Sequence, residues 1–416
     1  MTFSMTTMAA QAKLAANQVA VLTSTEKNQT LQAMANNLRN SHTAILAANK
    51  RDLTSATEND LSSAMIDRLT LNPERIDAIA AALEEIIALP DPIGEVNKQT
   101  IRPNGITVGK MKIPLGVIAM IYEARPNVTA DAAALCLKAG NAVILRGGRE
   151  ALQSSLAIAK CLHQALESQG INPAAISVVP DPDRKHMNEL MTLTESVDLI
   201  IPRGGEGLIR FVCENSRVPV IQHFKGVCHL YVDKDANLEK ALNILLNGKV
   251  QRPGVCNSLE TLVVHGDIAT EFLPHVAKAF VENKVKVHAC EQSIGYFDGA
   301  QAATDADYDA EYLALEIAVK VVPDYDQAIK HIQRFSSGHT EVIITQDIST
   351  SQRFVKQINS AVVMVNASSR FSDGGELGLG AEIGISTSKL HAYGPMGVES
   401  LTTEKFVVIG DGQVRS

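Results

Sequence analysis

The chain has no tryptophan, and aromatic residues make up only 4% of its 416 positions. Its cores must therefore rest on alanine, leucine, isoleucine and valine, because these residues dominate the 45% hydrophobic content. With only 20% charged residues, this is enough apolar material for large packed cores. A chain of this length is expected to form two or three domains.

The sequence also lacks a basic tract, and its 38 Lys and Arg against 46 Asp and Glu give a formal net charge of -8. This balance argues against nucleic acid or an anionic membrane as the main partner. Apolar runs such as residues 116–122 are too short to span a bilayer. The first twelve residues carry no charge and no long apolar run, so they do not have the pattern of a secretory signal.

Six cysteines are present, but none forms a Cys-x-x-Cys pair, and no histidine cluster has zinc spacing. The simplest interpretation is a reduced cytoplasmic protein without a structural metal.

The first ninety residues have helical patterns, the clearest of which begins with Asn72 as cap and Pro73 in the first turn. After a linker at residues 90–94, two strands flank Arg-Pro-Asn-Gly at residues 102–105, which predicts a β-hairpin. Such a hairpin is either an arm for a partner subunit or a ribbon that faces solvent.

From residue 116 onward, short apolar runs alternate with amphipathic helices, which predicts a parallel sheet covered on both faces. The runs are residues 116–122, 142–145, 176–179 and 197–201. A second alternation begins after about residue 232, so two α/β lobes are expected. Residues 292–310 lack periodicity and are predicted to form a surface loop, and residues 370–384 form a glycine-rich loop outside the strands.

Cys256 lies in the segment Gln-Arg-Pro-Gly-Val-Cys-Asn, residues 251–257, just before a strand-like run. A thiol on a glycine-containing loop can approach a substrate carbonyl, and a nearby cation favours its thiolate form. The alternative is an inert, packed cysteine, because free cysteines are among the most buried residues.

Two glycine-rich turns follow strands of the first lobe and are candidate phosphate-binding turns. They contain Arg203, Gly204, Gly205 and Gly207, and Arg146, Gly147, Gly148 and Arg149. The two arginines of the second turn would suit the 2′-phosphate of NADP. Neither the Gly-x-Gly-x-x-Gly nor the Walker A spacing is present, so ordinary tight turns with surface arginines remain an alternative.

Asn127 follows the strand at residues 116–122, where its amide could donate to a developing oxyanion. The alternative is that it satisfies local backbone groups, which is a common role for asparagine.

Several motifs together resemble the aldehyde dehydrogenase superfamily, and the similarity runs in order from about Gln11 to the C-terminus. They lie at residues 122–128, 137–146, 251–257, 370–386 and 391–397. The resemblance implies an α/β, aldehyde dehydrogenase-like fold of two doubly wound lobes with a β-hairpin oligomerisation arm. It implies an NADP-binding domain at 1–95 and 114–230, a catalytic domain at 231–398, and an oligomerisation hairpin and C-terminal strand at 96–113 and 399–416.

The resemblance also implies an activity, the NADPH-dependent reduction of L-glutamyl 5-phosphate to L-glutamate 5-semialdehyde and phosphate through a Cys256 thioester. This is the second step of proline biosynthesis from glutamate. Asn127 and the Cys256 backbone N–H would hold the oxyanion. The remaining roles fall to Arg125, Arg252 and Arg370 for the substrate anions, the two glycine-rich turns for the cofactor phosphates, and Glu316 for the nicotinamide ribose.

Two other functions stay open, a hydrolytic NAD(P)-dependent aldehyde dehydrogenase and a nucleotide-binding protein without turnover. Hydrolysis needs a carboxylate base, whose position falls near His223, yet no Asp or Glu occurs between Asn215 and Val232. An enzyme whose thioester must accept hydride should lack such a base. The segment 221–226 departs from the Lys-His pair usual in the family, so the roles of His223 and Lys225 are open.

Homo-oligomerisation is expected, with the hairpin and a strand at residues 405–409 pairing across subunits. Transient contact with glutamate 5-kinase is plausible, because an acyl phosphate is labile.

Overall fold

The computed structural model describes residues 3–390 and 392–415, so His391 of the last motif lies outside the described residues. The chain divides into two compact units. Unit 1 comprises Met1–Gln222, Gly378–Gly384 and Met396–Ser416, and unit 2 comprises His223–Leu377 and Ile385–Pro395. The assignment of these parts to cofactor binding and catalysis stays a prediction.

Unit 1 contains a parallel sheet of four strands in the order β5-β4-β3-β6. The strands are β3 (Val117–Tyr122), β4 (Ala142–Arg146), β5 (Ile176–Val178) and β6 (Leu199–Arg203). Every residue of β3 is buried, as its continuous apolar sequence predicts for a strand covered on both faces. The four strands predicted from the sequence are thus confirmed.

Helices cover both faces of this sheet. Alternate residues of β3, such as Val117 and Ala119, pack with Met5 of α1 and Val212 of α9, while α6 and α7 contact β4 and β5. Among the helices of the described residues, none is long and apolar enough to cross a membrane. The helices of unit 1 are α1 (Met5–Val19), α2 (Ser24–Asn40), α3 (His42–Glu58), α4 (Ser63–Leu69), α5 (Pro73–Ala88), α6 (Asn127–Lys138), α7 (Leu152–Ser168), α8 (Arg184–Leu190) and α9 (Glu206–Asn215).

The start of α5 shows why the sequence pattern was informative. The side chain of Asn72 accepts a hydrogen bond from the backbone N–H of Arg75 at 2.7 Å, and Pro73 occupies the first turn. An asparagine cap satisfies one of the backbone donors left free at a helix start, and proline loses nothing there because it has no N–H. The predicted helix is confirmed.

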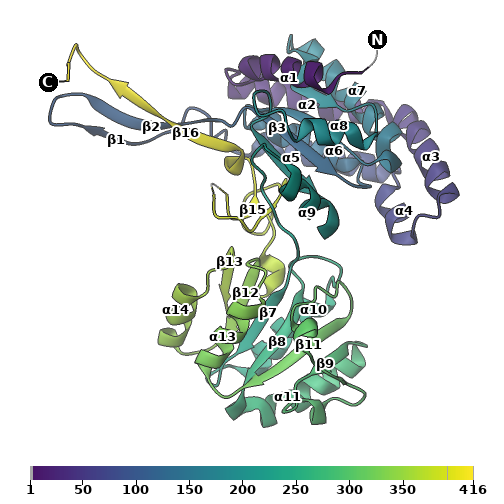
Figure 1. Cartoon of the computed structure of the whole chain (residues 1–416), viewed down its shortest axis with the longest axis vertical. Helices are drawn as coiled ribbons and strands as arrows, with labels where there is room; N and C mark the ends of the chain where they lie inside the picture. Colours follow the sequence, from purple (N-terminus) through teal and green to yellow (C-terminus); the bar gives the residue numbers. More distant parts are fainter. Residues whose placement is uncertain (1–2, 391, 416) are drawn as a thin grey trace. The chain divides into compact units, whose positions relative to one another are not determined.

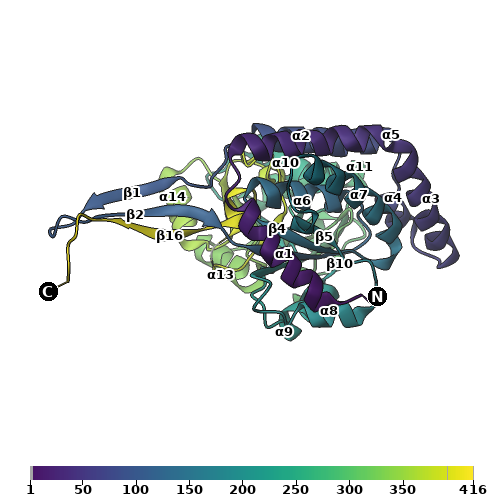
Figure 2. The same ribbon diagram turned by 90° about the horizontal axis from the view of Figure 1, so that it is seen from above.

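A three-stranded antiparallel sheet extends from unit 1 as an arm (Figures 1 and 2). Its strands are β1 (Val96–Ile101), β2 (Thr107–Pro114) and β16 (Thr402–Ile409), with β2 in the middle. Gly105 adopts a φ of 88° in the β1–β2 turn, a conformation that favours glycine. The predicted hairpin is confirmed.

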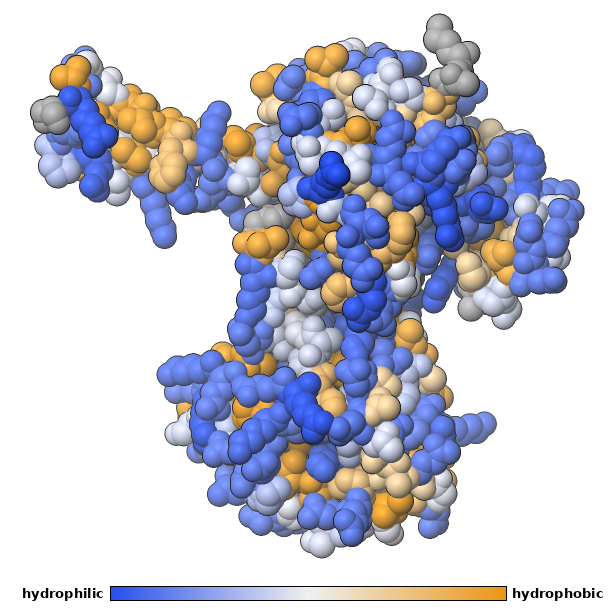
Figure 3. Space-filling model, viewed as in Figure 1, coloured by the Kyte–Doolittle hydropathy of each residue, from blue (hydrophilic) through white to orange (hydrophobic). Residues whose placement is uncertain are grey.

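The C-terminal strand β16 pairs with β2 of its own chain over its full length. Pairing of the arm across subunits stays a prediction. Pairing within one chain needs no association of a second molecule, and this arrangement leaves β1 and β16 as the two edges of the arm. Figure 3 shows apolar side chains gathered along it. The exposed apolar residues of its strands are Val96, Ile101, Phe406, Val408 and Ile409.

Unit 2 contains a parallel sheet of seven strands in the order β10-β9-β11-β8-β7-β12-β13. These are β7 (Cys228–Val232), β8 (Leu259–His265), β9 (Lys286–Ala289), β10 (Gln301–Ala302), β11 (Glu316–Val322), β12 (Thr340–Ile344) and β13 (Val362–Val365). The helices are α10 (Leu238–Val250), α11 (Gly266–Glu282), α12 (Asp305–Tyr308), α13 (Tyr325–Phe335) and α14 (Ile348–Gln357). A two-stranded sheet pairs β14 (Gly384–Ser386) with β15 (Gly394–Met396).

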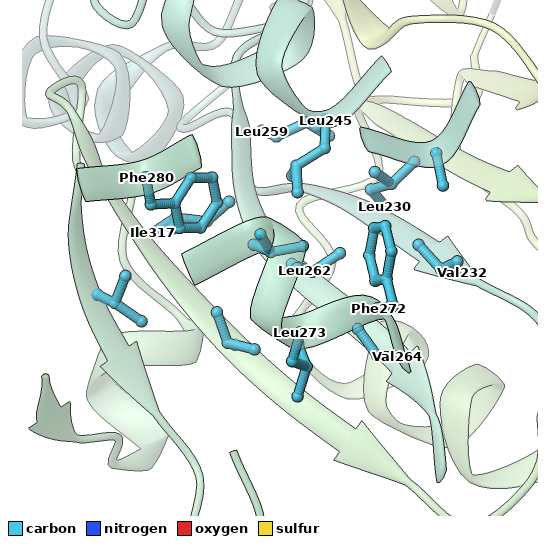
Figure 4. Close-up of a cluster of buried hydrophobic side chains, with 14 of the residues drawn as sticks. Leu230, Val232, Leu245, Leu259, Leu262, Val264, Phe272, Leu273, Phe280 and Ile317 are labelled. Atoms are coloured by element: carbon cyan, nitrogen blue, oxygen red, sulfur yellow. The ribbon is translucent and has the colours of Figure 1, made fainter. Parts of the chain in front are cut away.

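Successive residues of the unit 2 strands enter different cores. Leu262 packs with Phe272 and Phe280 of α11 (Figure 4), whereas its neighbour Val263 packs with Ile329 of α13 on the opposite face. This alternation follows from the strand geometry, in which consecutive side chains point to opposite faces. The sheet is therefore covered on both sides, as its apolar strands predict.

Residues 292–310 lie at the surface as predicted, but they are not an irregular loop. This segment contains the edge strand β10 and the short helix α12, and Tyr308 is buried. The elements are too short to show a hydrophobic period, and Tyr308 is anchored by tertiary contacts with His331 and Phe335.

Candidate active site

Cys256 lies half-buried in the loop between α10 and β8 of unit 2, referred to below as the Cys256 loop (residues 251–258). An ion pair closes the base of this loop, because Lys249 before it and Glu260 after it are 2.7 Å apart and fully buried. The pair fixes the separation of the chain segments that enter and leave the loop.

Each side chain of this pair needs the other in order to stay charged in the protein interior. Burial raises the pKa of Glu260 to about 7 and lowers the pKa of Lys249, since each charge has left water. Loss of one partner from such a buried pair typically costs about 3–5 kcal/mol, because the other charge stays buried without compensation. The base of the loop is therefore sensitive to either substitution.

The peptide of Cys256 is held on two sides by the chain that enters β7. A Cβ atom at Gly226 would lie 2.1 Å from the carbonyl oxygen of Cys256, so that position has no room for a side chain. The thiol of Cys228 donates a hydrogen bond to the same oxygen at 3.2 Å. Burial raises the pKa of Cys228 well above its usual range, which keeps that donor protonated.

Arg370 braces the loop from the glycine-rich segment that follows β13. Its guanidinium donates to the side-chain oxygens of Asn257 and Gln251, the latter at 2.9 Å. Burial and the neighbouring charge of Arg252 lower the pKa of Arg370. The structure thus brings two of the three predicted substrate arginines to the Cys256 loop, where positive charge favours a thiolate.

Two histidines lie beside the Cys256 thiol. One ligand atom each of His223, Cys256 and His339 fall within 4.8 Å of one another. The sequence placed His223 at the position of the missing base, but it gave no signal for His339, which the parallel sheet brings in through β12. Burial lowers the pKa of His339 to about 3, so its imidazole is neutral at physiological pH.

Glu316 begins β11 and forms an ion pair with Lys286 at 2.8 Å, and it also contacts His288. Hydrogen bonds from Lys286 and His288 lower the pKa of its carboxyl, so it is ionised at neutral pH. Because β11 and β8 run parallel side by side, Glu316 and the Cys256 loop share the amino edge of the unit 2 sheet.

The two glycine-rich turns of unit 1 meet in one cavity of about 740 Å³ at the carboxyl ends of β4 and β6. Of the predicted cofactor residues, this cavity is lined by Arg146, Gly148, Arg149 and Gly207. Gly147, Gly204 and Gly205 belong to the same turns. Arg184 at the start of α8 also lines the cavity and was missed by the sequence reasoning, because no motif marks it.

The cavity has features of an anion site. Arg146 is half-buried, and its Nε has no hydrogen-bond partner among the described residues. Burial lowers the pKa of its guanidinium, Glu150 opposes this shift, and Arg184 and Arg149 lower the pKa by repulsion. Three guanidiniums held close enough to repel one another would be stabilised by a bound phosphate.

Asn127 is the first residue of α6, which is separated from the end of β3 by four residues, so it follows that strand as the sequence predicts. Its Nδ2 donates to Asp131 at 2.9 Å, and desolvation raises the pKa of this carboxyl to about 6. The contact orients the Asn127 amide and leaves its second N–H for another acceptor.

Two predicted arginines lie in the same unit. Arg203 ends β6 beside Glu382, and its charge opposes the rise in the pKa of Asp131. Arg125 is half-buried and directly precedes Pro126.

Replacement of Gly226 by alanine should displace the Cys256 loop, because the new methyl group would overlap the Cys256 carbonyl. We expect a fall of about 2–4 °C in melting temperature from overpacking, together with an altered rate of Cys256 alkylation. Mass spectrometry after iodoacetamide treatment measures that rate. Gly254→Ala is the matched control in the loop itself, since its Cβ would meet only ordinary contact at 3.7 Å. Equal behaviour of the two variants would contradict the role of Gly226.

Comparison with known proteins agrees with this geometry. The model of the aldehyde dehydrogenase family matches residues 4–295. A gamma-glutamyl phosphate reductase from Colwellia psychrerythraea is 61% identical over 414 residues, which is 99% of both proteins. Another, from Idiomarina loihiensis, is 62% identical over 405 residues, or 97% of both. The crystal structure of gamma-glutamyl phosphate reductase from Thermotoga maritima superposes with a TM-score of 0.98 at 42% identity, covering 100% of both chains. The expected fold is therefore confirmed, and the chain belongs to the aldehyde dehydrogenase family, within its group of gamma-glutamyl phosphate reductases.

Proposed function

We propose that the protein reduces L-glutamyl 5-phosphate to L-glutamate 5-semialdehyde and phosphate with NADPH. The observation that carries this proposal is the Cys256 loop, in which Gly226 fixes the cysteine backbone and the half-buried thiol lies beside two imidazoles and interacts electrostatically with Arg370. The full-length identity to proteins named for this reaction supports the choice of substrate.

In the first step the Cys256 sulfur attacks the acyl carbon and the C–O bond to phosphate breaks. Of the two neighbouring imidazoles, His339 is a poor base because its pKa is lowered to about 3, so we assign proton acceptance from the thiol to His223. The proton then leaves with the phosphate. By resemblance to the family, we assign the hydrogen bonds to the oxyanion to the Asn127 amide and the Cys256 backbone N–H. A thioester remains on the enzyme.

A bound nicotinamide dinucleotide phosphate would supply the hydride that reduces this thioester to the aldehyde. The cavity of unit 1 fits such a cofactor, because Arg146, Arg149 and Arg184 can hold its 2′-phosphate. The backbone N–H groups at the start of α9 suit a pyrophosphate, although Glu123 accepts from the Gly205 N–H at 3.0 Å and would have to move. Glu316 is proposed for the nicotinamide ribose.

The substrate carries a phosphate and an α-carboxylate, for which Arg125, Arg252 and Arg370 are the proposed partners. Arg370 already donates to Gln251 and Asn257, so its first role is to hold the loop, whereas Arg252 is exposed. The hydrolytic alternative is disfavoured because the segment between Asn215 and Val232 offers no carboxylate base to activate water, and because the full-length relatives are named for the reductase reaction.

Oxidation of glutamate semialdehyde with NADP should require inorganic phosphate, because the thioester is released by phosphate and not by water. The absorbance of reduced nicotinamide measures the rate with and without phosphate.

We expect the Cys256→Ser variant to lose nearly all activity, since a serine hydroxyl is a far weaker nucleophile than a thiolate at neutral pH.

The matched control is Cys213→Ser, a half-buried cysteine of unit 1 that lies outside both sites and should keep the wild-type rate. Turnover that is independent of phosphate would favour the hydrolytic enzyme. An unchanged rate in Cys256→Ser would contradict the covalent mechanism.

The Arg149→Gln variant should raise the KM for NADPH about tenfold while the KM for NADH changes by less than about twofold, as expected for loss of one charge-assisted hydrogen bond to the 2′-phosphate. Steady-state kinetics with both cofactors measure the two values. Arg217→Gln, an exposed arginine of unit 1 outside the cavity, is the control. An equal rise for both cofactors would place Arg149 away from the 2′-phosphate.

We also propose that the arm is the oligomer contact, because its strands expose apolar side chains along two open edges. Phe406→Glu, in an edge strand and 70% exposed, should reduce the mass measured by light scattering after size exclusion. Val414→Glu, exposed but beyond the strand, should not change it. An unchanged oligomer in Phe406→Glu would refute this assignment.

A further inference from the structure

The side chains of His223, Cys256 and His339 form a cluster that the proposed reaction does not fully explain. They come from the segment before β7, the loop before β8 and the residue before β12. These three strands are neighbours in one parallel sheet, so the cluster is held by a rigid framework. One ligand atom from each side chain lies within 4.8 Å of the other two, and the two imidazole centroids are 4.9 Å apart.

His339 is prepared as a ligand by its surroundings. The hydroxyl of Thr340 donates to Ser372 at 2.8 Å, so its oxygen can accept the Nδ1–H of His339 at 2.7 Å. This places the proton on Nδ1 and leaves a lone pair on Nε2. That nitrogen is buried and has no hydrogen-bond partner within the part of the chain that the structure describes. A histidine that donates one N–H to an oxygen and presents its other nitrogen has the arrangement seen in protein metal ligands.

The chemistry of the three donors selects one class of ion. Thiolate and neutral imidazole are the ligands of Zn²⁺ and other borderline-soft divalent cations, whereas Mg²⁺ and Ca²⁺ need oxygen ligands. Three protein ligands with an open fourth position are a common zinc arrangement. Bonds of about 2.0–2.3 Å would require the donor atoms to approach one another by roughly 1 Å, which small side-chain rotations can supply.

We propose that His223, Cys256 and His339 form a binding site for Zn²⁺ or a similar divalent cation, and that occupation reversibly blocks the nucleophile. The blocking role rests on the proposed function of Cys256, whereas metal binding itself does not. On binding, the thiol releases its proton to solvent as the sulfur–metal bond forms, so a chelator and a proton restore the free thiol. The absence of a zinc motif in the sequence does not oppose this, because the ligands meet only through the tertiary structure.

The test measures Cys256 alkylation in the full-length protein without any need for turnover. Zinc chloride should slow iodoacetamide labelling of Cys256 by about tenfold or more, and EDTA should restore it. Labelling of Cys213 in the same molecule should be unaffected. Cobalt chloride should produce a thiolate-to-cobalt charge-transfer band with the intensity of a tetrahedral site.

The His339→Asn variant should lose this protection and the cobalt band, and His223→Asn provides the same test at a less buried position. The control variant His331→Asn changes a buried histidine of unit 2 outside the cluster, and it should keep the zinc protection and the cobalt band.

Equal protection in wild type and in both cluster variants would overturn the site. Zinc protection of Cys256 in a protein that proves to have no reductase activity would keep the metal site and reject the proposed function. Zinc binding without loss of activity would overturn the blocking role.

Discussion

The contact between the Gly226 backbone and the Cys256 peptide is the constraint on which the position of Cys256, the proposed nucleophile, depends. Because the segment before β7 lies so close to the loop before β8, any side chain at Gly226 would push the cysteine out of place. The same closeness lets the Cys228 thiol reach the Cys256 carbonyl, which is a side-chain contact that only a neighbouring strand can provide. The rest of the site is arranged around a peptide that cannot move far in either direction.

An ion pair between the residues that flank the Cys256 loop holds its two ends together. The buried pair of Lys249 and Glu260 fixes the base, and burial pulls the pKa values of the two groups toward each other. Such a pair adds little net stability compared with apolar residues of the same size, but it penalises any arrangement that separates the charges. We therefore interpret the Lys249–Glu260 ion pair as an interaction that favours one conformation of the loop. Arg370 adds a second restraint, because it donates hydrogen bonds to Gln251 and Asn257 near the two ends of the loop.

The two sheets use opposite edges for their chemistry. In unit 1 the cavity lies at the carboxyl ends of the strands, where the turn into α9 exposes backbone donors to an anion. In unit 2 the cysteine lies at the amino edge, after the end of α10, where a helix supplies no positive potential. The positive charge that favours a thiolate must therefore come from side chains, and Arg252 and Arg370 supply it.

Local signals in the period, caps and turns of the sequence were enough to predict the four strands of the first lobe, the capped helix at Asn72 and the hairpin, and to single out the segments of Cys256 and Asn127. The strands β7, β9 and β10 of unit 2 were not among those predicted. Residues 292–310 were misjudged as an irregular loop, since their elements are too short to show a period and Tyr308 is ordered by distant partners. Only the tertiary structure decided that the C-terminal strand joins β2 of its own chain, that Arg184 lines the arginine cavity, and that His339 stands beside Cys256. The reason is the same in each case: a parallel sheet brings together residues that are far apart in the chain, and no local pattern records which strands become neighbours.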